Sequence, residues 1–105
     1  LAVAGYHVVA PDQRGYGRTT GSTDAYDQDL RPFSMPALVR DVVALTYALG
    51  YRRVHALIGH DFGSPVAGWC AVVRPDLFGS VVMMSAPFAG PPQVEHYNLV
   101  AKSAD

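Results

Sequence analysis

Three short apolar segments constrain the fold of this chain more than any other feature of its sequence. They cover residues 6–10, 54–58 and 80–84, and β-branched residues occur in each of them. Apolar and polar side chains do not alternate there, as they would in a strand with one face in water. Continuous apolar runs of this length are typical of strands buried on both faces. We therefore expect three parallel β-strands.

Two helical patterns separate these segments. The first predicts a helix over residues 36–49, because its apolar residues recur at spacings of four, three and four and so share one face: Leu38, Val42, Leu45 and Leu49. Ser34 can cap the start of this helix, and Gly50 can end it in a left-handed conformation. The second pattern predicts a helix over residues 64–73 with one face of small side chains that can approach a sheet closely: Ser64, Ala67, Gly68 and Ala71.

The order strand, helix, strand, helix, strand predicts an α/β fold with adjacent parallel strands and right-handed crossover helices. The long connection over residues 12–33 is polar and rich in glycine. It follows the carboxyl end of a predicted strand, which is where open α/β sheets place their ligands.

Composition limits the classes of function. The 105 residues fit one domain, half of them are apolar, and the net charge of −1 comes from scattered charges without a basic patch. Without a basic patch, we expect no nucleic-acid partner. We also expect no membrane partner, because no apolar run approaches the ~20 residues that span a bilayer. The single cysteine, Cys70, excludes an intrachain disulfide and fits a reducing, cytoplasmic location. Both ends look like cuts, so we interpret the chain as a fragment.

The segment over residues 57–65 carries the chemistry. It runs from a predicted strand directly into a predicted helix, and Asp61 stands between Gly59 and Gly63. Small residues two positions before and after a nucleophile are typical of the nucleophile elbow of hydrolases, in which a tight turn holds the nucleophile above the sheet. The Phe62 N–H would then point to where an oxyanion forms. The alternative is that Asp61 only caps the following helix.

Four segments resemble epoxide hydrolases and haloalkane dehalogenases: residues 5–19, 59–63, 74–78 and 80–88. The resemblance covers nearly the whole chain in the right order. It implies a partial α/β-hydrolase fold, with residues 1–105 as an incomplete core domain and residues 89–105 as the start of the lid. It also implies that Asp61 is a nucleophile, which attacks a saturated carbon to give an alkyl ester. No cofactor or metal is expected, and the expected partner is a small-molecule substrate.

Phe62 favours an epoxide over a haloalkane as the substrate. Haloalkane dehalogenases typically place Trp directly after the nucleophile, where the indole N–H binds the halide, and phenylalanine has no such donor. Epoxide hydrolases instead use lid tyrosines as proton donors. A haloalkane dehalogenase, or a non-catalytic module that only binds a ligand, remains an alternative.

Other catalytic groups of the family are expected outside this chain. These are the base histidine, the acid, the lid tyrosines and the loop with the second oxyanion donor, and neither His96 nor Tyr97 is assigned to these roles. The chain alone is therefore expected to lack turnover. Asp12 and Arg14 are interpreted as structural residues that brace the loops near the elbow.

Overall fold

The computed structural model describes residues 1–22 and 25–90 of the chain. It contains two α-helices, α1 (Met35–Ala48) and α2 (Gly63–Val73), and two strands, β1 (Leu57–His60) and β2 (Val81–Met84). Two short 3-10 helices, Ala2–Ala4 and Arg31–Phe33, lie in the N-terminal part. Both predicted α-helices are confirmed, and each begins one residue earlier than the sequence pattern indicated.

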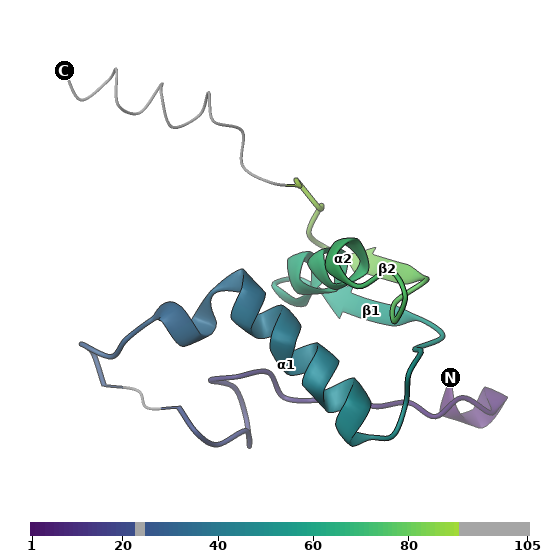
Figure 1. The fold of residues 1–105 in the computed structure, drawn as a ribbon, viewed down its shortest axis with the longest axis horizontal. Helices are drawn as coiled ribbons and strands as arrows, with labels where there is room; N and C mark the ends of the chain where they lie inside the picture. Colours follow the sequence, from purple (N-terminus) through teal and green to yellow (C-terminus); the bar gives the residue numbers. More distant parts are fainter. Residues whose placement is uncertain (23–24, 91–105) are drawn as a thin grey trace.

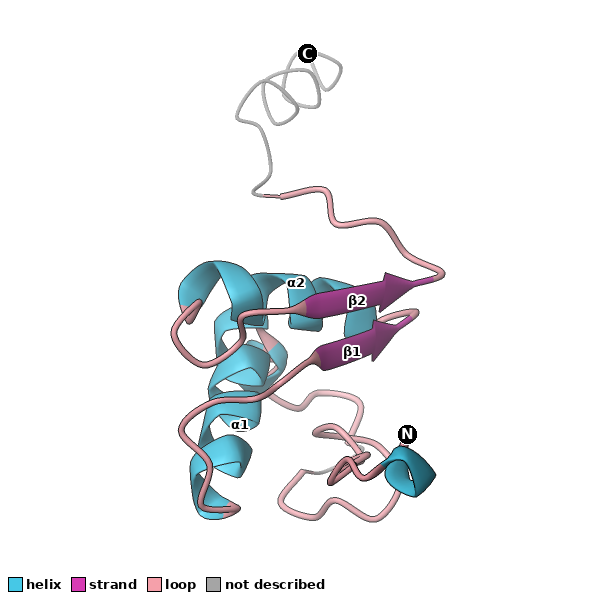
Figure 2. Ribbon diagram, turned by 90° about the vertical axis from the view of Figure 1, so that its right-hand side faces the viewer, coloured by secondary structure: helices cyan, strands magenta, loops and turns pink. Residues whose placement is uncertain are grey.

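The two strands form a parallel sheet, as expected. Leu57 pairs with Val81 and His60 with Met84, so the carboxyl ends of both strands lie at the same edge. Helix α2 is the crossover between the strands, and it packs against one face of the sheet while α1 packs against α2 (Figures 1 and 2). The strand expected from residue 54 begins at Leu57, because Val54 makes only an isolated bridge with Phe78.

The predicted strand at residues 6–10 is wrong for the described structure. This segment is loop, and its apolar side chains are largely exposed, with Tyr6 at 48% and Val8 at 47%. A strand exists through hydrogen bonds to a neighbouring strand, and the backbone of residues 6–10 makes none to β1 or β2. The sheet therefore has two strands among the described residues, and α1 does not connect two paired strands.

The core lies between α1, α2 and the segment that leads into β2. It contains Leu38 and Val39 from α1, Val66 and Cys70 from α2, and Leu77 and Phe78 from the connection. The face predicted for α1 is buried at Leu38 but exposed at its last member, Leu49. Gly50 takes the expected left-handed conformation with φ 85°, although Ser34 makes no side-chain capping bond.

Among the described residues, the sheet is covered on one face only. On the other face, Ile58, Val82 and Met84 are each more than 40% exposed, so burial of the strands on both faces is not observed here. Within the described ranges, no helix is long and apolar enough to cross a membrane.

Candidate active site

Asp61 occupies a strained turn at the carboxyl edge of the sheet. It follows the last residue of β1 and precedes α2 by two residues. Its φ of 51° lies in the left-handed region, as the elbow interpretation predicted, and its side chain is exposed. A non-glycine residue in this region costs on the order of 1–3 kcal/mol, and such residues cluster at functional sites. Helix capping alone does not require this conformation, because a capping residue ordinarily has an extended backbone.

Gly59 is required by the close approach of the turn. A Cβ atom at this position would lie 2.4 Å from the carbonyl oxygen of Gly63 and 2.7 Å from the Cα atom of Ser64. Both are backbone atoms, so neither can move aside without opening the turn.

Gly63 is not required in the same way, which corrects the expectation that both flanking positions must be small. The nearest atom to a Cβ atom there would be Nε2 of Gln13 at 3.6 Å, an ordinary contact. The described neighbours of Gly63 therefore leave room for a methyl group.

Backbone hydrogen bonds fix the turn to β2. The Asp61 N–H donates to the Met84 carbonyl at 2.9 Å, and the Ser64 N–H donates to the Asp61 carbonyl at 3.0 Å. Ser85, directly after Met84, also has positive φ, 66°. The ends of both strands are thus strained and joined, and sequence patterns gave no sign of the strain at Ser85.

Phe62 lies between the candidate nucleophile and α2. Its backbone is already helical, with φ −63° and ψ −24°, and its N–H donates to no group in the described part of the chain. The first N–H groups of a helix have no intrahelical acceptor, and they carry the positive end of the helix dipole. The Phe62 N–H is therefore one of the donors at the positive end of α2, next to Asp61. The Phe62 ring is 50% exposed.

Asp12 and Arg14 make structural contacts in the loop beside the elbow. The Asp12 carboxylate accepts a hydrogen bond from the Arg18 N–H at 3.0 Å, and it fills the space that a side chain on Gly17 would need. Arg14 binds Asp41 of α1 through two hydrogen bonds of 2.8 and 2.9 Å. These bonds hold the pKa of Asp41 below its usual value. Both residues thus brace the loop against its surroundings.

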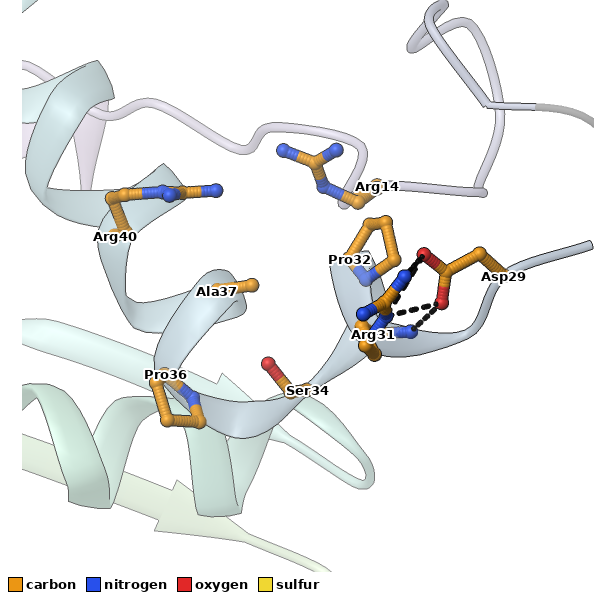
Figure 3. A pocket seen from close by; sticks show the side chains of 8 residues that line it. All are labelled: Arg14, Asp29, Arg31, Pro32, Ser34, Pro36, Ala37 and Arg40. Atoms are coloured by element: carbon orange, nitrogen blue, oxygen red, sulfur yellow. Dashed lines mark hydrogen bonds and ion pairs between the residues drawn. The ribbon is translucent and has the colours of Figure 1, made fainter.

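Two open pockets lie near this loop, and only one reaches the elbow. A pocket of about 550 Å³ is lined by Phe62 together with Gln13, Tyr16 and Phe33. The other, of about 580 Å³, lies at the start of α1, where Arg31 is paired with Asp29 (Figure 3). No residue of the elbow lines this second pocket. We therefore associate the pocket beside Phe62 with the candidate active site.

Other candidate groups are not brought to the elbow. His60 is exposed, and its side chain takes part in no hydrogen bond with the described residues near the elbow, where Ser64 and Met84 make theirs. The same part of the chain holds no group of three or more His, Cys, Asp or Glu residues that could bind a metal ion. His96, Tyr97 and most of the expected lid segment lie outside the described residues.

Residues 1–101 match the α/β hydrolase fold family. The chain belongs to this family. A structure of an epoxide hydrolase from an endophytic Streptomyces superposes on this α/β-hydrolase chain with a TM-score of 0.71 and 34% identity, covering 87% of this chain and 26% of that one. The expected fold class, a partial α/β-hydrolase core, is thereby confirmed.

Curated relatives of this α/β-hydrolase chain include several epoxide hydrolases. Epoxide hydrolase B of Mycobacterium tuberculosis is 42% identical over 90 residues, which cover 86% of this chain and 24% of the relative. An epoxide hydrolase of Caballeronia sordidicola is 38% identical over 88 residues, with 84% and 25% covered. The chain thus resembles epoxide hydrolases in sequence, and it spans about a quarter of the length of these relatives.

Proposed function

We propose that the whole protein opens epoxides to diols, with Asp61 as the nucleophile. The strained, exposed position of Asp61 at the end of β1 carries this proposal. The tight turn leaves Asp61 exposed at the carboxyl edge of the sheet, where a substrate can reach its carboxylate from outside. The resemblance to epoxide hydrolases supplies the substrate class.

The reaction takes place in two steps. A carboxylate oxygen of Asp61 attacks an epoxide carbon, the ring C–O bond breaks, and the ring oxygen takes a proton from a donor outside this chain. The product is a hydroxyalkyl ester on Asp61. Water then adds to the ester carbonyl, and the Phe62 N–H stabilises the resulting oxyanion. The collapse of this intermediate releases the diol and restores the carboxylate.

Isotope labelling tests the covalent step in the full-length protein. In a single turnover in ¹⁸O water, attack on the ester carbonyl places the label in the Asp61 carboxylate and leaves the diol unlabelled. Direct attack of water on the epoxide places the label in the diol instead. Mass spectrometry of the peptide with Asp61 and of the diol distinguishes the two, and label in the first diol would refute the ester.

Haloalkanes are the second substrate class to test. The Phe62 side chain has no N–H to donate to a leaving halide, so diol formation should exceed halide release in matched turnover assays. Faster halide release would reverse the assignment. A protein that binds an epoxide but turns over neither substrate would be a binding module. The isolated 105-residue chain should be inactive, because the proton donor and the base are proposed to lie elsewhere.

A further inference from the structure

The Ser64 side chain makes three hydrogen-bonding contacts beside the elbow. It lies in the first turn of α2 and has no exposed surface. Its Oγ lies 3.0 Å from the Gly59 carbonyl oxygen and 2.8 Å from the Met84 carbonyl oxygen, and it accepts a hydrogen bond from the Met84 N–H at 3.1 Å. One hydroxyl group therefore touches the strand before the turn and the end of the neighbouring strand.

These bonds close a network around Asp61. The Met84 carbonyl that faces the Ser64 hydroxyl also accepts the N–H of Asp61, and the Ser64 N–H donates to the Asp61 carbonyl. The Asp61 carbonyl is thus bonded to the backbone of Ser64. The Asp61 N–H is bonded to the Met84 carbonyl, which the Ser64 hydroxyl also contacts. A smaller side chain without the hydroxyl would fit the space but would lose these contacts with the Gly59 and Met84 backbone.

We propose that Ser64 is a positioning residue for the Asp61 nucleophile, an inference that rests on the proposed function. The left-handed conformation of Asp61 persists only when its surroundings determine it. Loss of the hydroxyl frees the ends of β1 and β2 relative to α2. The carboxylate then samples orientations that cannot attack, and small misplacements of a reacting group cost large factors in rate.

The test compares Ser64→Ala with Thr46→Val in the full-length protein. Thr46 is a matched control, because it is 6% exposed and its hydroxyl donates to a backbone carbonyl, that of Val42, within α1. We expect Ser64→Ala to slow single-turnover ester formation about tenfold, with KM changed less than about twofold. Thr46→Val should lower the melting temperature without slowing ester formation. Ser64→Cys, which keeps a weak donor, should fall between Ser64→Ala and the parent.

Two outcomes would overturn the proposal. The first is that Ser64→Ala forms the ester within about twofold of the parent rate. If the alanine variant does not fold, ester formation by Ser64→Cys at the parent rate would have the same meaning. The other is equal slowing by Thr46→Val, which would show a general effect of stability.

Hydrogen exchange at the Asp61 and Met84 amides gives a readout that does not depend on activity. Both amides should exchange faster in the Ser64 variants than in the parent, and their exchange rates should be unchanged in Thr46→Val. If the parent forms no ester, the proposed function fails, and exchange at parent rates would still refute the role of Ser64 separately.

Discussion

Replacing Gly59 with alanine isolates the geometry of the elbow from its chemistry. The backbone of Gly59 has no positive φ, so alanine meets no conformational penalty there. The added methyl group would instead lie within 2.7 Å of three backbone atoms, two from Gly63 and the Cα of Ser64. Overpacking of this kind typically costs about 1–3 kcal/mol, and we expect about 3 kcal/mol because no flexible side chain can yield. The turn should open, and ester formation at Asp61 should fall.

Gly63→Ala is the matched control for this prediction. Its methyl group would meet only Nε2 of Gln13, at 3.6 Å, and alanine favours a helix over glycine by up to about 1 kcal/mol. Urea unfolding of the full-length variants, with single-turnover ester formation, measures both effects. Equal stability of Gly59→Ala and the parent, or equal damage by Gly63→Ala, would refute the steric argument.

Three further predictions concern the surroundings of the elbow. Because Arg14 lowers the pKa of Asp41 in the folded state, this pair stabilises the fold above the unfolded pKa of Asp41. That contribution should vanish as the pH falls through the folded pKa, and Arg14→Met should reduce the acid-dependent loss of stability in unfolding curves by the share that Asp41 contributes. Burial raises the pKa of Cys70 to about 11, so iodoacetamide at neutral pH should alkylate Cys70 only after unfolding, as mass spectrometry would show. Phe78→Ala should cost about 3–5 kcal/mol in urea unfolding, because Phe78 is 1% exposed in the core.

Local patterns predicted both helices and the two strands that pair. The run of small residues in α2 agrees with the buried side of that helix. The face predicted for α1 agrees only in part, because it is buried at Leu38 and exposed at Leu49. The segment at residues 6–10 has an equally clear strand pattern but no neighbour to pair with among the described residues. An apolar run indicates only that a segment tends to be buried. A strand also needs a neighbouring strand that accepts and donates its backbone hydrogen bonds.

The candidate site shows the same division between local and long-range information. The strained conformation of Asp61 and the need for Gly59 follow from a pattern of five residues, and both were predicted. The room beside Gly63 could not be predicted, because it is set by Gln13 from a distant loop. Ser64 was expected only as a small residue facing the sheet. Its bonds to Met84 depend on how β2 pairs with β1, which no local pattern shows. In the sequence, Ser64 therefore looks interchangeable with alanine, whereas in the fold its hydroxyl contacts the ends of both strands beside the turn at Asp61.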